Sequence, residues 1–405
     1  MHSVAENFFF LERPYLLVVH IPYYEDEDGS VWLEQLWHHD LVEHLSYLKN
    51  FTLCAPRFKK GATPGLARLE APPGTRLSIV PLPPQTSTLE SLRNLPQTAA
   101  ALWRAIGDAD IVHSSVVGWP YPLGWLTNPI ALLRRKRLLV VVEGSWVRSG
   151  KQKTLKDRLI ERATEVMGRW SCNRADVCLF TQPGYRELLF THGRGAAYIT
   201  PAVWVREEDI LDRATAEQLW SVKVREPVRL LFAGRLVVGK GVDVLLSALR
   251  ILDARGVPVT IDIIGSGDRR EAFVEAQSAF NSVRLSVLDP VPYGAPFMKL
   301  IDGYHALVIP SLGDEQPRVL FDASARAVSS LASDTDGLRA HVEHGKTGWM
   351  LPVGNPEAWA TAVERLSADP PLLRDMGMAA HRATAASTHR AMHQRRSNIL
   401  REHFA

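Results

Sequence analysis

A basic loop in the second half of the chain is the first feature that could bind a charged ligand. Residues 230–241 read LLFAGRLVVGKG, an apolar run that leads into a loop holding Arg235 and Lys240. Arginine offers a planar fork of donors and lysine a point charge, so together they suit a diphosphate. The glycines at 234, 239 and 241 would let the backbone approach a ligand closely. Taken alone, the motif is equally typical of a solvated basic loop.

Two later loops add a glycine turn and two carboxylates. Residues 261–267 read IDIIGSG, where Gly265 by itself indicates only a turn after a strand. Residues 309–325 read IPSLGDEQPRVLFDASA, which predicts a strand end, a polar loop and a helix from about Pro317. Such a helix start offers free backbone N–H groups to phosphate. Asp314 in the loop and Asp322 two turns into the helix could accept hydrogen bonds from hydroxyl groups. A capping and a solvated aspartate are the alternative.

The first half offers fewer chemical candidates. Residues 109–115, ADIVHSS, place His113 at the end of an expected strand, and residues 140–146, VVVEGSW, place Glu143 at the end of another. Glu143 could act as a general base or position a substrate. A buried structural histidine and a loop acid are the alternatives. Residues 23–30 form an acidic stretch, which we predict to be a solvated loop before a helix from about Trp32.

Helices and strands must position these candidate residues. The hydrophobic pattern predicts an α/β chain. Short apolar runs alternate with segments of helical period, such as residues 242–252. The expected strands are residues 16–20, 77–80, 110–112, 138–142, 176–180, 229–233, 260–264, 306–309 and 330–332. Continuous apolar strands between helices indicate parallel sheets covered on both faces.

Two series of strands predict two sheets, with a break between residues 201 and 227. We therefore expect two Rossmann-like, doubly wound domains facing across a cleft, residues 1–222 and 223–385. Ligands of such sheets bind beyond the carboxyl ends of the strands.

The three motifs of the second half, in this order and at these separations, resemble the retaining glycosyltransferases of the two-domain GT-B fold. The similarity is closest to the fourth sequence family, the glycosyl transferases group 1. That family shows strand-G-R-x-x-x-x-K-G-helix, then strand-G-x-G, then P-S-x-x-E-x-x-x-x-x-x-x-E-A. Residues 336–352, DGLRAHVEHGKTGWMLP, are similar to a further family segment. The resemblance covers residues 228–375 and extends more loosely over the first half.

The resemblance implies a site for a nucleotide-diphosphate sugar. Arg235 and Lys240 would bind the diphosphate, Asp322 the ribose, and Asp314 or the adjacent Glu315 the sugar. The residues that it places around the donor are Gly234, Arg235, Lys240, Gly265, Asp314, Glu315, Arg318, Val319 and Asp322. Both motif glutamates of the family are aspartates in this chain.

The resemblance also implies a mechanism and its catalytic residues. In that family the departing phosphate is thought to assist the incoming hydroxyl, so that the enzyme positions the reactants and stabilises charge. Arg235 and Lys240 would supply that charge without a metal or other cofactor. His113 matches a family histidine, whereas Glu143 and Ser115 stand where relatives often carry others. The family further implies that residues 386–405 form a helix crossing back to the first domain.

The predicted function is transfer of a glycosyl group, with retention, onto a hydroxyl of a saccharide, lipid-linked or small-molecule acceptor. Polysaccharide or glycoconjugate biosynthesis is the expected setting. A nucleotide-sugar-binding partner subunit that has lost catalysis is the alternative.

The composition limits the kinds of partner that the protein can bind and the cellular compartment in which it can work. A net charge of +3 and a pI near 8.7 are too weakly basic for a dedicated nucleic-acid binder. Three cysteines without CxxC spacing predict a cytoplasmic protein without structural zinc. We see neither a signal peptide nor an apolar run long enough to span a membrane. Trp119, Tyr121 and Trp125 before the basic residues 134–137 could touch the inner face of a membrane, stack on a sugar or belong to the core.

Overall fold

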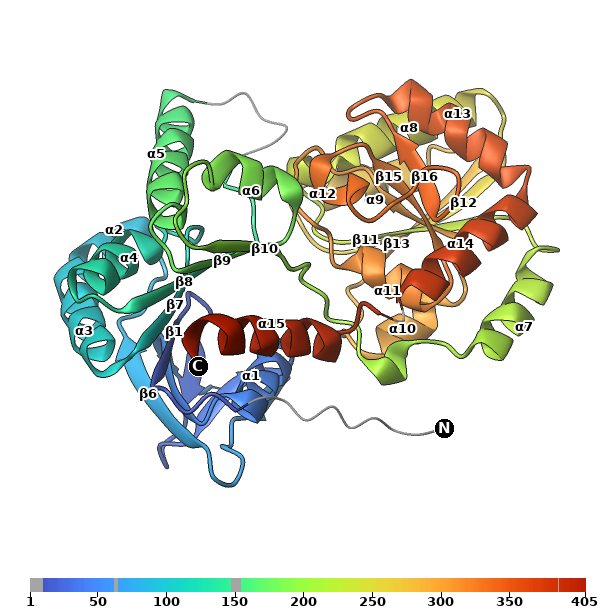
Figure 1. Cartoon of the computed structure of the whole chain (residues 1–405). Coiled ribbons are helices and arrows are strands. Elements are labelled where there is room, and N and C mark those ends of the chain that lie inside the picture. Colours follow the sequence, from blue (N-terminus) through green and yellow to red (C-terminus); the bar gives the residue numbers. More distant parts are fainter. Residues whose placement is uncertain (1–9, 62–64, 147–153, 385) are drawn as a thin grey trace. The chain divides into compact units, whose positions relative to one another are not determined.

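The computed structural model describes residues 10–61, 65–146, 154–384 and 386–405 (Figure 1). The chain divides into two compact units. The first comprises Met1–Trp146, Leu159–Pro201 and Met392–Ala405, and the second comprises Val147–Arg158 and Ala202–Ala391. The junctions therefore lie near Pro201 and Ala391, whereas the boundaries predicted from the sequence follow residues 222 and 385.

The first unit is built on a ten-stranded sheet with the order β10-β9-β8-β7-β1-β4-β2-β3-β5, and β6 also pairs with β4. Its strands are β1 (Tyr15–Val18), β2 (Tyr23–Glu25), β3 (Val31–Glu34), β4 (Asn50–Lys59), β5 (Leu66–Arg68), β6 (Arg76–Leu82), β7 (Ile111–Ser115), β8 (Arg137–Val142), β9 (Val177–Phe180) and β10 (Ala196–Ile199). Seven of them, β10, β9, β8, β7, β1, β4 and β6, run parallel. Strand β2 extends this parallel set beside the end of β4, while β3 pairs antiparallel with both β2 and β5.

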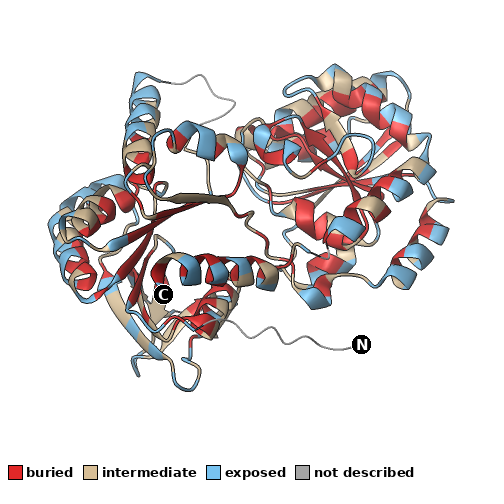
Figure 2. Cartoon of the chain, in the orientation of Figure 1, coloured by how far each residue is buried: buried red, intermediate tan, exposed pale blue. Residues whose placement is uncertain are grey.

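Helices cover both faces of this sheet. They are α1 (Gln35–Tyr47), α2 (Thr88–Arg93), α3 (Leu95–Asp108), α4 (Gly124–Leu133), α5 (Leu155–Cys172), α6 (Pro183–Leu189) and α15 (His389–Phe404). Side chains of α1 and α15, such as Leu41 and Leu400, join Leu17 in one apolar core. Leu102 of α3 joins Leu16 in the core on the opposite face. Strand β1 is thus buried on both sides, as its unbroken apolar run predicts (Figure 2).

The second unit is a six-stranded parallel sheet with the order β13-β12-β11-β14-β15-β16. Its strands are β11 (Arg229–Ala233), β12 (Val259–Ile264), β13 (Val283–Leu288), β14 (Ala306–Ile309), β15 (Ser329–Ser333) and β16 (Gly348–Leu351). Its helices are α7 (Arg213–Lys223), α8 (Val242–Ala254), α9 (Arg270–Gln277), α10 (Ala295–Ile301), α11 (Val319–Ala325), α12 (Asp336–Arg339), α13 (Pro356–Ser367) and α14 (Pro370–Thr384), with 3-10 turns η1 (Glu207–Asp209) and η2 (Val238–Lys240). The apolar stripe predicted for residues 242–252 is buried in one core of this unit. The predicted α/β fold with two parallel-sheet units is confirmed.

The acidic stretch at residues 23–30 differs from its prediction. It contains β2 and the turn into β3, in which Trp32 pairs with Tyr24, and helix α1 begins only at Gln35. Gly29 adopts a φ of 79° in the turn. Tyr23 and Tyr24 of β2 and Trp32 of β3 are residue types that favour strands, but the acidic turn between them concealed both strands.

The basic cluster at residues 134–137 has a structural role. Arg134 Nη1 donates to the Trp103 carbonyl at 2.8 Å, and its guanidinium lies 4.9 Å from the centre of the Trp103 ring. Lys136 Nζ donates to the carbonyl of Gly107 at 2.8 Å. These carbonyls belong to the last turns of α3, where cations satisfy free carbonyls and the helix dipole. Trp119, Tyr121 and Trp125 lie at or before the start of α4, whereas the basic cluster follows its end.

No helix within the described ranges is long and apolar enough to cross a membrane.

Candidate functional site

The strand order of the second unit creates one favoured place for a ligand. From β11 the chain moves outward through β12 to β13, and it then returns to the other side of β11 as β14. The crevice between the carboxyl ends of β11 and β14 is therefore a topological switch point, where ligands of open α/β sheets bind. The basic loop follows β11, and the loop with Asp314 follows β14.

These two loops are in direct contact. The Leu312 amide donates to the Gly239 carbonyl at 3.0 Å. Gly241 has a φ of 69°, and a Cβ placed there would lie 1.7 Å from the Pro310 carbonyl oxygen. Only glycine permits this conformation and this close approach. The glycine after Lys240 thus packs one loop against the other.

The glycine turn after β12 packs against the loop after β11. Gly234 N donates to the Ile264 carbonyl at 3.0 Å, and Leu236 N donates to the Ser266 carbonyl at 2.8 Å. A Cβ on Gly265 would lie 1.9 Å from the Gly234 carbonyl oxygen. Gly265 is buried, so its place in the structure is explained by contact with the loop after β11.

Lys240 and Glu315 form an ion pair across the crevice, with 2.7 Å between Nζ and Oε1. Their side chains are 18% and 31% exposed, so solvent reaches the pair only in part. Arg235, on the same loop as Lys240, is exposed, and so is Asp314, the neighbour of Glu315 in the chain. The structure therefore joins Glu315 to the lysine predicted to bind phosphate.

Asp322 lies in the first turn of α11, because the helix begins at Val319, two residues after Pro317. Its side chain is buried, and Tyr293 Oη donates to Oδ1 at 2.8 Å. Burial raises the pKa of Asp322 to about 7, against the opposing effects of the Tyr293 hydrogen bond and of Arg318. Tyr293 lies in the loop after β13, and no local sequence pattern indicates its contact with Asp322.

The loop after β14 is also anchored through its other polar residues. Gln316 Oε1 accepts from the Ala202 amide at 3.0 Å, and Gln316 Nε2 lies 2.9 Å from Nε2 of His341. The exposed guanidinium of Arg318 lies 4.9 Å from the centre of the Trp204 ring. Val319, its neighbour, is the first residue of α11. These contacts hold the loop in shape with its cationic side chain at the surface.

Of the two catalytic candidates in the first unit, His113 lies in a structural environment. His113 is buried, and its Nδ1 lies 2.8 Å from Tyr15 Oη. Burial, assisted by Arg396 and His44, lowers the pKa of His113 well below its usual value. The imidazole is thus neutral and held within the core. This environment fits the structural alternative for a histidine at a strand end.

Glu143 follows β8 and is about half exposed, with Oε1 3.4 Å from Nη2 of Arg396. Arg396 comes from α15 and is buried, and its Nη1 lies 3.0 Å from Nε2 of His44. Glu143 therefore acts as the counter-ion of a buried arginine from the far end of the chain, a contact that no local pattern could indicate.

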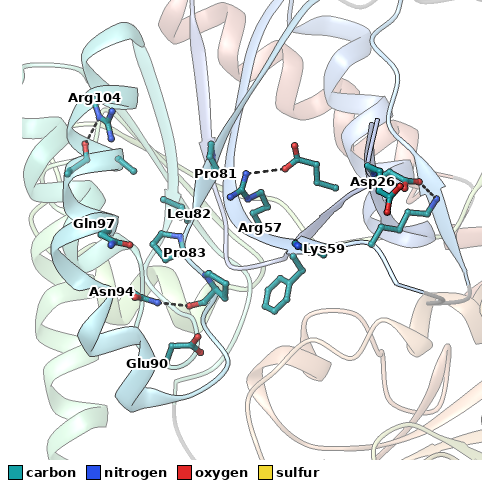
Figure 3. Close-up of a pocket in the computed structure, with 17 residues that line it drawn as sticks. Asp26, Arg57, Lys59, Pro81, Leu82, Pro83, Glu90, Asn94, Gln97 and Arg104 are labelled. Atoms are coloured by element: carbon teal, nitrogen blue, oxygen red, sulfur yellow. Dashed lines mark hydrogen bonds and ion pairs between the residues drawn. The ribbon is translucent and has the colours of Figure 1, made fainter. Parts of the chain in front are cut away.

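A cavity of about 1180 Å³ lies in the first unit, at the carboxyl ends of β4 and β6 and against α2 and α3 (Figure 3). Its rim includes the acidic stretch, where Glu25 pairs with Arg57 at 3.3 Å and Asp26 with Lys60 at 2.6 Å. The lining also includes the amides of Asn94 and Gln97, a run of prolines and apolar side chains such as Phe58 and Leu82. Such a mixture of paired charges and amides suits a ligand rich in hydroxyl groups.

The parallel sheets and the site at the switch point define a class of protein, a two-domain α/β transferase of the GT-B type. Comparisons with known families agree in both units. Residues 40–201 match the glycosyl transferase 4-like domain, and residues 227–369 match the glycosyl transferases group 1. The chain belongs to this group of GT-B glycosyltransferases.

Similar proteins include an actinobacterial relative and two solved structures. A D-inositol 3-phosphate glycosyltransferase of Streptomyces bingchenggensis is 34% identical over 167 residues, which are 38% of this chain and 36% of the relative. The match thus spans little more than a third of that relative's length. Sucrose-phosphate synthase of Thermosynechococcus elongatus has a TM-score of 0.71 at 17% identity, covering 96% of this chain and 99% of that one. Anabaena HepE in complex with UDP-glucose has a TM-score of 0.67 at 13% identity, covering 96% and 100%.

Proposed function

We propose that this protein transfers a glycosyl group, with retention, from a nucleotide-diphosphate sugar to a hydroxyl acceptor. The observation that carries the proposal is the cation at the switch point, Lys240, set between the loops after β11 and β14. Arg235 and Arg318 are exposed on the same two loops. Together these three cations can neutralise the two negative charges of a sugar-linked diphosphate. The group 1 family match and the UDP-glucose complex of HepE support this choice of donor.

In the proposed reaction the bond between the anomeric carbon and the diphosphate oxygen breaks. The acceptor oxygen bonds to the anomeric carbon on the same face, and the acceptor proton passes to the departing phosphate. Arg235 and Lys240 stabilise the negative charge that develops on the leaving group, which is where electrostatic catalysis is most effective. We propose that these cations meet the diphosphate without a metal ion.

We assign the acceptor to the cavity of the first unit. Its acids and bases are partly paired with one another, and its amides can donate and accept hydrogen bonds. This lining favours a saccharide or another polyhydroxylated acceptor over a strongly charged one. Polysaccharide or glycoconjugate synthesis would supply such acceptors.

We further propose that the protein works in the cytoplasm, because Cys54, Cys172 and Cys178 are all free and buried. Contact with a membrane that carries a lipid-linked acceptor would use Trp119, whose side chain is 59% exposed.

A binding panel tests the proposed donor. Calorimetry and thermal shift with UDP, GDP, ADP, dTDP and their glucose and mannose conjugates are expected to show that one nucleotide binds at about micromolar Kd. EDTA should leave that Kd unchanged. The purified protein should then release the nucleoside diphosphate from its matching sugar when a hydroxyl acceptor is supplied. If none of these nucleotides binds, the donor site is wrong.

Substitution of Glu315 tests the ion pair. Because Glu315 neutralises Lys240 in the free protein, Glu315→Gln should strengthen binding of the nucleoside diphosphate about threefold to fivefold, the size of a partly exposed ion pair. Isothermal calorimetry measures the change. Glu343→Gln, which opens the exposed pair with Lys346, is the matched control. Weaker binding would instead show that Glu315 itself holds the ligand.

A further inference from the structure

Strands β8, β9 and β10 lie side by side and parallel at one end of the first sheet, so their amino ends share an edge (Figure 1). A cavity of about 430 Å³ lies at this edge. It is lined by the basic side chains of Arg137, Arg174, Arg194 and His403, together with Ala175, Asp176, Gly195 and Ala196. The cavity that we assign to the acceptor lies at the opposite, carboxyl ends of strands of the same sheet. The edge cavity is therefore a separate site.

Gly195 holds two of the arginines close together. A Cβ on Gly195 would lie 2.2 Å from the carbonyl oxygen of Asp176 and 2.3 Å from that of Ala175. Only glycine has room at so close an approach. The loop that carries Arg194 is thereby packed against the turn that carries Arg174.

The edge cavity has an excess of positive charge. The one acid among its lining residues is already paired, because Asp176 Oδ1 lies 2.9 Å from Arg137 Nη1 and its Oδ2 accepts from the Leu138 amide at 2.8 Å. Arg174 and Arg194 are exposed, and no carboxylate in the described part of the chain forms an ion pair with either of them. Three guanidinium groups and one carboxylate leave two positive charges in the cavity.

Arg174 and His403 are held in place by neighbouring aromatic residues. The guanidinium of Arg174 lies 4.8 Å from the centre of the Trp170 ring, and its Nη1 donates to the Trp170 carbonyl at 3.4 Å. These contacts orient the guanidinium without neutralising it, so its other N–H groups can donate to a ligand. His403 Nε2 lies 2.7 Å from Tyr198 Oη and 3.8 Å from Glu402 Oε1, and Glu402 is outside the cavity lining.

We propose that the edge cavity binds a phosphate monoester, carried either by a soluble sugar phosphate or by the head group of a phosphatidate lipid. A phosphate monoester has close to two negative charges at neutral pH, which the two unpaired arginines can neutralise. Guanidinium groups also donate in pairs to phosphate oxygens. The cavity has the volume of a small-ligand site. The inference does not rest on the proposed function, because Lys240 and the donor loops belong to the other unit.

Two probes distinguish the sources of the phosphate. Calorimetry measures binding of glucose 6-phosphate, with glucose as the uncharged comparison. Co-sedimentation measures binding to phosphatidylcholine vesicles with and without phosphatidic acid. We expect the full-length chain to bind one phosphate probe with a Kd below about 1 mM and to bind neither uncharged comparison. Arg174→Gln/Arg194→Gln should weaken that binding about tenfold, since two exposed charge-assisted contacts are lost.

Arg213→Gln/Arg374→Gln is the matched control, because it removes two exposed arginines of the second unit that pair with Glu217 and Asp375. This control and Lys240→Ala should both leave the Kd unchanged, and circular dichroism should show that all variants are folded. Equal losses in the two double variants would show attraction by net charge alone and would overturn the inference. Loss in Lys240→Ala, or binding of neither phosphate probe, would overturn it as well.

Discussion

Lys240→Ala is expected to lower kcat/KM for the nucleotide sugar by about a thousandfold, the effect of removing one preorganised charge from a leaving group. Lys240 is mostly shielded from water, and its Nζ lies between loops that close backbone contacts hold in place. A charge fixed in this way needs little reorganisation when the diphosphate departs. Most of the loss should appear in kcat, because the leaving group carries more charge in the transition state than in the bound donor.

Steady-state kinetics with the donor identified by the binding panel measures this effect. Lys346→Ala is the matched control, since Lys346 is exposed and pairs with Glu343 at 2.8 Å. Circular dichroism should show that both variants are folded. A Lys240→Ala enzyme within tenfold of the unmodified protein would contradict the proposed catalytic role and would point to Arg235 as the main charge.

Asp322→Asn is expected to stabilise the protein at pH 8 by up to about 4 kcal/mol while weakening the binding of the nucleoside diphosphate. The pKa of Asp322 is about 7 in the folded protein, against about 3.9 in an unfolded chain. The contribution of protonated Asp322 to the free energy of unfolding is fully present below pH 3.9. It falls by about 1.4 kcal/mol per pH unit as the pH rises, and it is lost above pH 7. Asparagine has no charge to bury, so it escapes this loss.

Urea unfolding between pH 4 and pH 8 measures the difference. The two proteins should be nearly equal at pH 4, and the variant should become the more stable as pH rises towards 8. Asp375→Asn is the control, because Asp375 is exposed beside Arg374. Binding should weaken because a neutral amide accepts hydrogen bonds from the hydroxyl groups of the ligand less strongly than a carboxylate does. A stability difference that does not change with pH would show that burial does not raise the pKa of Asp322.

Strand β4 shows where prediction from the sequence fails. Residues 50–59 read NFTLCAPRFK, and the polar residues and Pro56 conceal a ten-residue strand. Its middle is buried between β1 and β6, whereas its end pairs only with the short β2. Such a strand is stabilised by its neighbours rather than by its own composition, so a local pattern could not reveal it.

The functional loops were easier to predict than the contacts between them. Arg235 and Lys240 lie close together in the chain, and strand, glycine and helix follow in a local order that the sequence shows. His113, by contrast, was a candidate for catalysis on its position at a strand end. Its hydrogen bond with Tyr15 depends on the pairing of β1 with β7, which joins distant parts of the chain.

The sequence by itself determined the alternation of buried strands and amphipathic helices, because the period of apolar residues is a local property. It also determined which loops carry cations and carboxylates. Only the tertiary structure decided that Lys240 pairs with Glu315, that Tyr293 donates to Asp322 and that Arg396 pairs with Glu143. These pairs form because sheet order brings separate loops and helices together, and that order is set by the packing of the whole unit.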